Sequence, residues 1–231
     1  MSDKFVEGSS SIKSVNAYIP IRDSVSNLKN ITLGLNTSAI LMTDPKLFLF
    51  TLSKYKFALK MIGGQRKILE IGCMEGAGTL LLSSLGASVT AVDFYRPHIR
   101  EAILHIQPLL KNVEFIAMDF LDSQYKNSFN GVVCFDVLEH IDPLHTDLFL
   151  GKVYDALENG GVAIIGMPSL ESQIYASEIN KHSHINCMDV EHAKNCIGKF
   201  FKSILVFSMN DEVIHTGYHK MSHYNIYLCI K

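Results

Sequence analysis

A glycine-rich turn with two carboxylates is the first stretch of this sequence whose residue types and spacing could do chemistry. In KILEIGCMEGAGTL, a short apolar run ends near Glu70, and the turn after it contains Glu75 and three glycines, Gly72, Gly76 and Gly78. Glycines between a strand and a helix let a nucleotide-like ligand approach the backbone. The spacing differs from the G-x-G-x-x-G of dinucleotide sites, and two carboxylates repel a pyrophosphate. The turn therefore predicts a cationic ligand.

Two further carboxylates end the next apolar runs. Asp93 ends SVTAVD and follows the first glycine of the turn by about 20 residues. A carboxylate at about this spacing accepts hydrogen bonds from a ribose diol. Asp119 ends VEFIAMD beside Phe120, where an acceptor and an aromatic ring could meet an adenine. One such acid alone is more often a helix cap or turn residue. Three at successive strand ends favour S-adenosylmethionine, which carries an ammonium and a sulfonium and no phosphate.

The elements that must position these residues alternate along the chain. A helix is expected over DPKLFLFTLSKYKFALKMIGG, from the cap Asp44 to the stop at Gly63 and Gly64. After it, apolar runs alternate with amphipathic stretches, which predicts βαβ units and a parallel sheet covered on both faces. ILVFSM and YNIYLCI are two further strands, expected to pair as an antiparallel hairpin at the sheet edge.

The remaining regions set the domain organisation. Residues 1–43 are rich in Ser and Asn without a sustained period, so they predict a loosely structured arm or lid. Residues 44–231 form the expected domain, with an acceptor-binding region at about 171–223.

Composition excludes several function classes. With 231 residues, 48% hydrophobic content and a net charge of -2, the chain suits one α/β domain with an appendage. It has no Lys/Arg-dense stretch for nucleic acid, no apolar run of about 20 residues and no signal peptide, so a cytoplasmic protein is expected. The five cysteines lack a CxxC pair, which favours free thiols. A homodimer is left open.

The motifs KILEIGCMEGAGTL, AVDF, AMDF and FDVLEHI, in this order, resemble those of class I S-adenosylmethionine-dependent methyltransferases, especially small-molecule O-methyltransferases with a D-V-L-E-H stretch. The resemblance covers roughly residues 45 to 170 and departs at Met74, where glycine is common. It implies a doubly wound α/β fold of the Rossmann-like methyltransferase type, with seven mostly parallel strands and an antiparallel last strand. It also implies a set of donor-binding residues: Glu70, Gly72, Cys73, Gly76, Gly78, Asp93, Phe94, Asp119, Phe120 and Asp136. Tyr55, on the preceding helix, is expected to reach the donor.

His140, in FDVLEHID, is the first candidate for a catalytic base, because a fourth strand end faces the site in such folds; the alternative is a histidine that only packs or caps. Asp136, Glu139 and His140 could instead hold Mg²⁺ or Mn²⁺. A histidine followed by Ile-Asn after Y-A-S, and the stretch MNDEVIHTG, resemble methyltransferases from bacterial surface-polysaccharide gene clusters. That resemblance assigns His184 and His215 to an acceptor pocket, with Tyr175 and Asn186 nearby; a histidine-rich surface hairpin is the alternative.

A zinc site is the other chemistry open to this region. HSHINCMDVEHAKNC contains five candidate ligands, namely His182, His184, Cys187, His192 and Cys196. No CxxC pair supports zinc, and a short helix capped by Asp189 explains the second half of the stretch without metal. Zinc is therefore not favoured.

The expected function is O-methylation of a small polar acceptor by S-adenosylmethionine. By resemblance the acceptor is a sugar, a nucleotide-activated sugar or a phosphoramidate-type precursor of a surface glycan. A donor-binding partner protein that has lost catalysis is the non-enzymatic alternative. An NAD-dependent oxidoreductase is disfavoured by the order of the glycines.

Overall fold

The computed structural model describes residues 12–26, 28, 30–63 and 66–231, in two units divided between Ile31 and Thr32. The smaller unit contains helix α1 (Ile12–Val25), and the larger one begins with helix α2 (Leu35–Thr43). The sequence predicted a loosely structured arm or lid over residues 1–43 and no particular element, whereas the structure has these two helices there. Among the described side chains of α2 only Thr37 is buried, so the helix has no apolar stripe that a sequence could display. Residues 1–11 and Gly64 lie outside the described residues, and the role of the arm as a lid stays a prediction.

The helix predicted after Asp44 is confirmed as α3 (Pro45–Ile62). The Asp44 side chain accepts a hydrogen bond from the Leu47 amide at 3.2 Å, and Pro45 occupies the first turn, where a missing amide proton costs nothing. Gly63 ends the helix at a φ of 84°, in the region that favours glycine. Among the described helices none is both long and apolar enough to cross a membrane.

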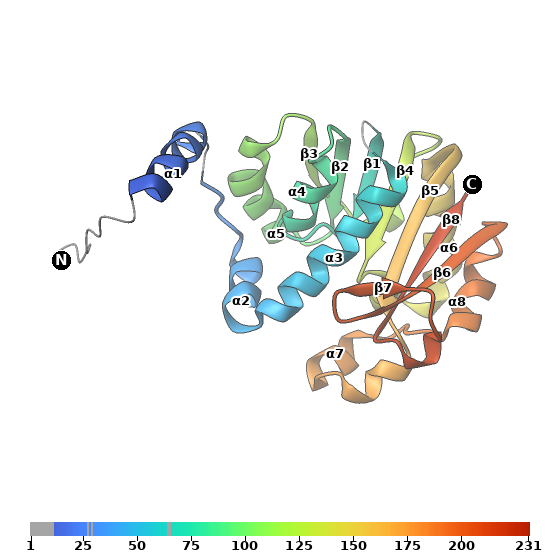
Figure 1. Cartoon of the computed structure of the whole chain (residues 1–231). Coiled ribbons are helices and arrows are strands. Elements are labelled where there is room, and N and C mark those ends of the chain that lie inside the picture. Colours follow the sequence, from blue (N-terminus) through green and yellow to red (C-terminus); the bar gives the residue numbers. More distant parts are fainter. Residues whose placement is uncertain (1–11, 27, 29, 64–65) are drawn as a thin grey trace. The chain divides into compact units, whose positions relative to one another are not determined.

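The sheet has eight strands in the order β3-β2-β1-β4-β5-β8-β6-β7 (Figure 1). Its strands are β1 (Lys67–Ile71), β2 (Ser88–Asp93), β3 (Val113–Ala117), β4 (Phe129–Phe135), β5 (Leu157–Pro168), β6 (Ser203–Asn210), β7 (Val213–His215) and β8 (Tyr224–Ile230). Strands β1 to β5 pair in parallel, as expected, whereas β8 pairs antiparallel with β5 and with β6.

Two details of the predicted sheet are wrong. The sheet contains eight strands rather than seven, because the connection from β6 to β8 forms the short strand β7, and three residues are too few to show an alternating pattern. The antiparallel last strand is also not at the edge. β6 and β8 do pair with each other, but β8 lies inside the sheet between β5 and β6, which explains why six of its seven residues are buried.

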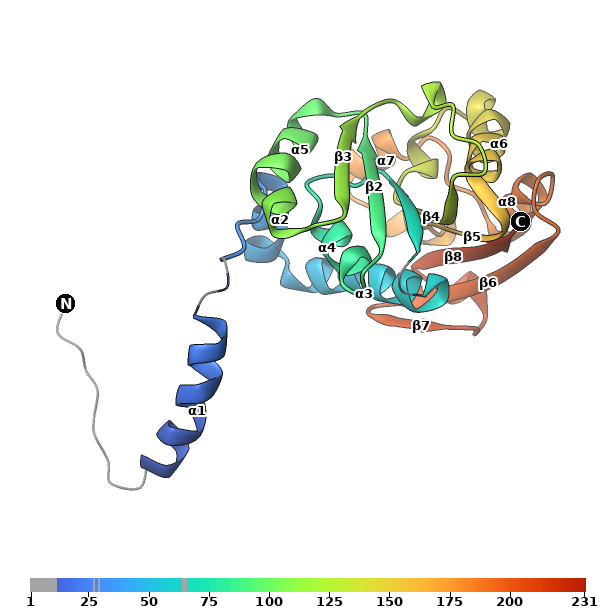
Figure 2. The same cartoon turned by 90° about the horizontal axis from the view of Figure 1, so that it is seen from above.

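Helices cover both faces of the sheet (Figure 2). One face packs against α3, α4 (Ala77–Ser83) and α5 (Arg96–Glu101), and the other against α6 (Thr146–Ala156) and α8 (Val190–Ile197). Adjacent residues of β1 divide between the two cores, since Ile68 belongs to the α3 side and Leu69 to the α6 side. This arrangement leaves the carboxyl ends of β1 to β4 together at one edge of the sheet.

Helical segments differ locally from the expected pattern. The stretch after β2 begins as α5 but continues as a π-helical turn (Ala102–Ile106) and a 3-10 turn (Gln107–Leu109). α6 ends at Ala156, and β5 begins at once at Leu157. The histidine-rich region forms a 3-10 turn (Glu171–Tyr175) and the short helix α7 (Glu178–Ser183), which was not expected.

Candidate functional site

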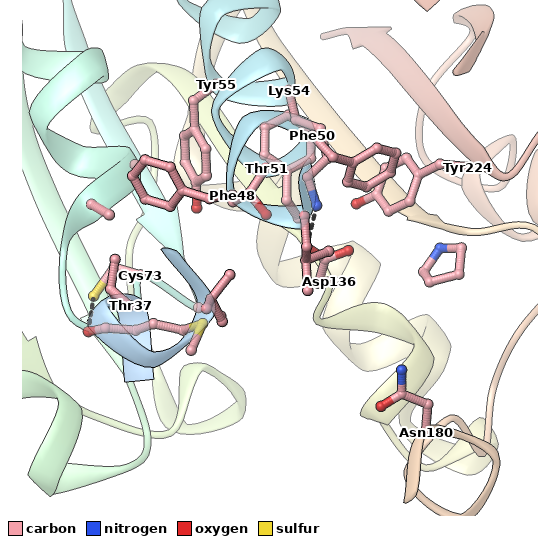
Figure 3. Close-up of a pocket in the computed structure, with 18 of the residues that line it drawn as sticks. Thr37, Phe48, Phe50, Thr51, Lys54, Tyr55, Cys73, Asp136, Asn180 and Tyr224 are labelled. Atoms are coloured by element: carbon pink, nitrogen blue, oxygen red, sulfur yellow. Dashed lines mark hydrogen bonds and ion pairs between the residues drawn. The ribbon is translucent and has the colours of Figure 1, made fainter. Parts of the chain in front are cut away.

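Two adjoining cavities lie at the carboxyl ends of β1 to β4. The larger, which we call the strand-end cavity, has a volume of about 720 Å³. The smaller, which we call the α3 cavity, has a volume of about 450 Å³ and lies against α2 and α3 (Figure 3). Gly72, Met74 and Asp136 line both cavities, so a ligand that fills the first can reach the second.

The glycine turn shapes the junction between the two cavities. Gly72 has a φ of 76°, and a Cβ there would lie 2.3 Å from Val137, so only glycine fits. A Cβ at Gly78 would lie 2.1 Å from the ring of Tyr55. Met74, which replaces the glycine common in the resembling family, adopts a φ of 47°, so the backbone keeps the left-handed conformation that glycine would allow.

The predicted adenosine-binding residues are brought together. Asp93, Phe94, Asp119 and Phe120 all line the strand-end cavity. Asp93 is 6% exposed and accepts hydrogen bonds from the amides of Met74 and Tyr95 at 2.9 and 2.8 Å. These bonds hold the carboxylate at the cavity wall.

Two of the predicted donor-binding residues support the turn from outside both cavities. Gly76 caps α4 in a left-handed conformation, and a Cβ there would lie 2.8 Å from the ring of Phe115. Glu70 is fully buried under the turn and accepts a hydrogen bond from the Thr79 hydroxyl at 2.6 Å. Burial raises the pKa of Glu70 to about 7, although the hydroxyls of Thr79 and Tyr55 act in the opposite direction. Glu70 therefore supports the turn without lining the cavities, and its role in donor binding stays a prediction.

Glu75, the second carboxylate of the turn, binds protein rather than ligand. Its oxygens accept hydrogen bonds from the amides of Asn36 and Thr37 at 2.9 and 2.8 Å and from the Thr37 hydroxyl at 2.8 Å. The two acids near the turn thus have different roles: Glu70 is buried beneath the turn and supports it, and Glu75 anchors α2. The sequence could not assign Glu75 because its partners lie 38 and 39 residues away.

Lys54 is the functional candidate that sequence reasoning missed. It is 1% exposed, and its ammonium pairs with Asp136 at the junction of the two cavities (Figure 3). The ammonium also lies 4.5 Å from the ring centroid of Tyr224 and 5.1 Å from that of Phe50, within the range of cation–π attraction. The sequence did contain a signal for it, because Lys54 lies on the apolar face of the helix predicted after Asp44. A lysine buried on that face needs a partner for its charge. Tyr55 and Cys73, both predicted to contact the donor, line the α3 cavity and not the strand-end cavity.

His140 and His184 meet where the two cavities adjoin. Their ring centroids are 5.1 Å apart; His140 lines the strand-end cavity and His184 the α3 cavity. Nδ1 of His184 lies 2.9 Å from the Gln173 amide oxygen, and Nδ1 of His140 lies 2.9 Å from the Ser183 carbonyl. Because both partners only accept, each ring donates from Nδ1 and keeps the Nε2 lone pair free. Burial, followed by the neighbouring His140, lowers the pKa of His184.

The other residues predicted for the acceptor pocket line neither cavity. His215, on β7, has Nε2 3.0 Å from the Asn210 side-chain oxygen and accepts at Nδ1 from the Gly217 amide. Tyr175 is 85% exposed. Asn186 is buried and donates to the Leu138 carbonyl and the Thr146 hydroxyl. Asn180 and His223 occupy the α3 cavity wall instead. The assignment from resemblance placed the right segment at the site but not these side chains.

One cluster of potential metal ligands occurs among the residues that the structure describes. Atoms of Glu139, His140 and His184 lie within 4.8 Å of one another. Within the described chain neither carboxylate oxygen of Glu139 has a hydrogen-bond partner, and burial raises its pKa well above the usual range. Asp136, expected in such a site, is paired with Lys54 instead. Of the five candidate zinc ligands, His184 belongs to this cluster, whereas His182, Cys187, His192 and Cys196 do not.

Comparison with known proteins identifies the central segment. Residues 68–161 match the protein family described as a methyltransferase domain. The mitochondrial ubiquinone biosynthesis O-methyltransferase of Schizosaccharomyces pombe is 39% identical over 87 residues, which cover 36% of this chain and 32% of that protein. The Idiomarina loihiensis ubiquinone biosynthesis O-methyltransferase is 33% identical over 81 residues, covering 34% and 33%. The match thus spans about a third of the length of these curated relatives.

The fold has solved counterparts over the whole chain. A Burkholderia thailandensis 1,6-didemethyltoxoflavin-N1-methyltransferase, solved with 1,6-didemethyltoxoflavin and S-adenosylhomocysteine, aligns with a TM-score of 0.64 at 16% identity, covering 100% of this chain and 93% of that one. The two curated relatives are ubiquinone biosynthesis enzymes, so they do not support the finer resemblance to surface-polysaccharide enzymes. Residues 68–161 are therefore similar to a methyltransferase domain, and the chain shares a Rossmann-like fold with the Burkholderia thailandensis methyltransferase.

Proposed function

We propose that the chain is an S-adenosylmethionine-dependent methyltransferase that binds the donor's adenosine in the strand-end cavity. The observation that carries the proposal is the row of Asp93, Asp119 and Phe120 along one cavity that opens into a second at Gly72 and Asp136. A buried carboxylate suits a ribose diol, and Phe120 with the exposed ring of Phe94 suits an adenine. Asp93, Asp119 and Asp136 line the cavity, and their carboxylates repel a pyrophosphate.

The methionine end of the donor has a charge pattern that the junction complements. S-adenosylmethionine ends in an ammonium and a carboxylate, and the junction presents the Asp136 carboxylate and the Lys54 ammonium side by side. Because the two side chains are already paired, the site is neutral without ligand and can exchange one internal ion pair for two charge-assisted contacts. This arrangement directs the sulfonium methyl towards the α3 cavity.

The α3 cavity then holds the acceptor. Methyl transfer is an in-line displacement in which the acceptor oxygen bonds to the methyl carbon as the bond from carbon to sulfur breaks, and the protein must align the two and remove a proton. His184 is the proposed base, because its Nε2 lone pair is free and its lowered pKa keeps it neutral near pH 7. His140 supports it from the strand-end side. An oxygen acceptor is favoured by the similarity to O-methyltransferases.

The walls of the α3 cavity restrict the class of acceptor. Phe48, Phe50, Phe135 and Tyr224 provide aromatic surface, and Thr51, Asn180 and His223 provide polar groups. Such walls suit a flat ring or the apolar face of a sugar that carries a hydroxyl. The surface-glycan precursors inferred by resemblance belong to this class, as do aromatic hydroxyl compounds.

A divalent cation is a second way to activate the acceptor hydroxyl. The buried, unpartnered carboxylate of Glu139 with His140 and His184 fits an ion that takes mixed oxygen and nitrogen ligands. Bound there, the cation would act as a Lewis acid on the acceptor oxygen. The two histidines would then serve as ligands through Nε2 instead of serving as bases.

The test begins with donor binding and continues with turnover. Calorimetry should show saturable binding of S-adenosylhomocysteine and no saturable binding of NADH; the reverse result would favour the oxidoreductase alternative. Labelled S-adenosylmethionine is then incubated with sugars, nucleotide-linked sugars and catechols, with and without EDTA, and products are analysed for a gain of one methyl. Donor binding without transfer to any acceptor, with or without Mg²⁺ or Mn²⁺, would favour the non-catalytic donor-binding alternative.

A further inference from the structure

Helix α2 forms part of the α3 cavity although almost nothing apolar holds it there. Thr37 and Ile40 line the cavity, whereas Leu35 and Met42 are 76% and 84% exposed. A nine-residue helix is not stable alone in water, and a segment with few buried apolar contacts opens easily. The docking of α2 must therefore depend on its polar contacts.

Glu75 supplies the strongest of these contacts. The first amides of a helix have no partner within it, and Gly34, at the cap position of α2, offers no side chain. Glu75 fills this role from the glycine turn, with three hydrogen bonds to Asn36 and Thr37. Gly34 is needed for this approach, because a Cβ there would lie 2.4 Å from the Glu75 carboxyl carbon. Glu75 is 3% exposed, so water competes poorly for these bonds.

His98 links α2 to the residue proposed to bind the donor's ribose. Its Nε2 lies 3.0 Å from the side-chain amide nitrogen of Asn36, and its Nδ1 lies 3.5 Å from Asp93 Oδ1. Because an amide nitrogen only donates, Nε2 accepts and Nδ1 carries the proton, directed to Asp93. Within the described chain this buried Nδ1 has no partner at full hydrogen-bond distance. His98 also lines the strand-end cavity, so a ligand there would contact it.

We propose that Glu75 is the positioning residue that docks α2 onto the donor-binding turn, and that His98 is the positioning residue that couples α2 to the donor through Asp93. Donor binding then tightens this docking and completes the acceptor cavity. Two routes connect the donor to α2: Asp93 holds the Met74 amide next to Glu75, and Asp93 faces His98, which contacts Asn36. A donor that fills the strand-end cavity restricts both routes. The acceptor then finds a complete cavity only after the donor is bound. The proposal has two halves. The docking half, which is the anchoring of α2 by Glu75, stands alone, whereas the donor-dependent half, which is the tightening of that docking by the donor, rests on the proposed function.

Hydrogen exchange of residues 35–43, followed by mass spectrometry with and without S-adenosylhomocysteine, tests both halves. In the unchanged protein the ligand should slow exchange of this segment by about fivefold or more, a typical coupling between two sites. Glu75→Ala should speed its exchange about tenfold or more even without ligand, because three buried hydrogen bonds are lost. His98→Ala should keep the unliganded protection but lose most of the increase that the ligand causes.

The controls separate docking from general loss of structure. His105→Ala removes a histidine that follows α5 and pairs with Glu101 at 3.4 Å outside both cavities, so it should leave the ligand effect intact. Exchange in β4 should be unchanged in every variant; if Glu75→Ala speeds β4 as much as residues 35–43, the specific docking role is overturned. The donor-dependent half alone is overturned if the ligand binds without slowing exchange of residues 35–43. It is also overturned if the ligand slows this exchange as much in His98→Ala as in the unchanged protein. Absence of any S-adenosylhomocysteine binding overturns that half together with the proposed function, while the unliganded comparison still decides the docking.

Discussion

The strand-end cavity and the α3 cavity share one wall but are built in different ways. The first consists of the turns that follow β1, β2, β3 and β4, which a parallel sheet brings to a single edge. The second combines side chains from α2, α3, α7 and the start of β8, segments up to about 190 residues apart in the chain. Residues that follow consecutive strands can be assigned by one topological rule, whereas residues that meet through helix docking cannot. The residues predicted to bind adenosine therefore line one cavity, whereas His184 is the one residue of the predicted acceptor pocket that lines the other. What each cavity binds stays a prediction.

The two cavities also differ in how their charges are held. Asp93 and Asp119 bind nearby backbone amides, within a few residues or across neighbouring strands. In the α3 cavity the charged and polar groups bind other side chains, as in the ion pair of Lys54 with Asp136 and the hydrogen bond of neutral His184 with Gln173. The first arrangement should tolerate changes in distant elements, and the second should not. Four predictions test this contrast.

The largest effect is expected at the acceptor side. His184→Ala should lower turnover by about 10²- to 10⁴-fold, the usual value of general base help, and should leave donor affinity nearly unchanged. Since the pKa of His184 is lowered, the acidic limb of the rate profile should lie below the ordinary histidine value of 6.5 and should disappear in the variant. His182→Ala is the control, because His182 lies in the last turn of α7, which ends just before His184, and lines neither cavity. Wild-type turnover in His184→Ala would remove this histidine from catalysis.

A smaller effect concerns the support beneath the strand-end cavity. The pKa of Glu70 rises from 4.5 to about 7 on folding, so the folded protein binds this proton more tightly than the unfolded chain. The resulting stability is complete below about pH 4.5 and is lost as the pH rises through about 7. Glu70→Gln lacks this titration. As the pH rises from 4.5 to 8, the unfolding free energy of the variant relative to that of the wild type should therefore increase by on the order of 3 kcal/mol. Urea denaturation at both pH values measures the difference in unfolding free energy between the two proteins. A difference that does not change with pH would contradict a buried, protonated carboxyl at Glu70.

Donor affinity tests the strand-end cavity directly. Asp93→Ala should weaken S-adenosylhomocysteine binding by about 2 to 3 kcal/mol, because a charge-assisted contact with the ribose is lost. Asp122→Ala removes an exposed carboxylate that lines neither cavity and should have no effect. Calorimetry gives both values. Unchanged affinity in Asp93→Ala would place the ribose elsewhere.

The smallest effect concerns Met74 in the glycine turn. A non-glycine residue at a φ of 47° costs about 1 to 2 kcal/mol, so Met74→Gly should stabilise the protein by up to about 1 kcal/mol after the greater freedom of the unfolded glycine is subtracted. Met42→Gly, on α2, should instead destabilise its helix by about 1 kcal/mol. Thermal unfolding of the two variants gives the signs. Destabilisation by Met74→Gly would show that the methionine side chain contributes more than its backbone costs.

The sequence alone determined the parallel part of the sheet and several residues of the strand-end cavity. Five apolar runs alternate with amphipathic stretches, and β1, β2 and β8 begin and end at the residues expected. Strand ends and glycine turns are local signals, because backbone conformation and burial leave their pattern within a few residues. For this reason the sequence pattern is sufficient to assign Gly72, Asp93, Asp119 and Phe120 to one cavity.

Only the tertiary structure decided the remaining features. The pairing of β8 with β5, the pairing of Lys54 with Asp136, and the anchoring of α2 by Glu75 each join segments about 40 to 80 residues apart. A lysine, an aspartate and a glutamate have the same local preferences whether they face solvent or bind each other across the fold. Their partners are set by the packing of helices against the sheet, which depends on the shape of the whole core rather than on any pattern near these residues.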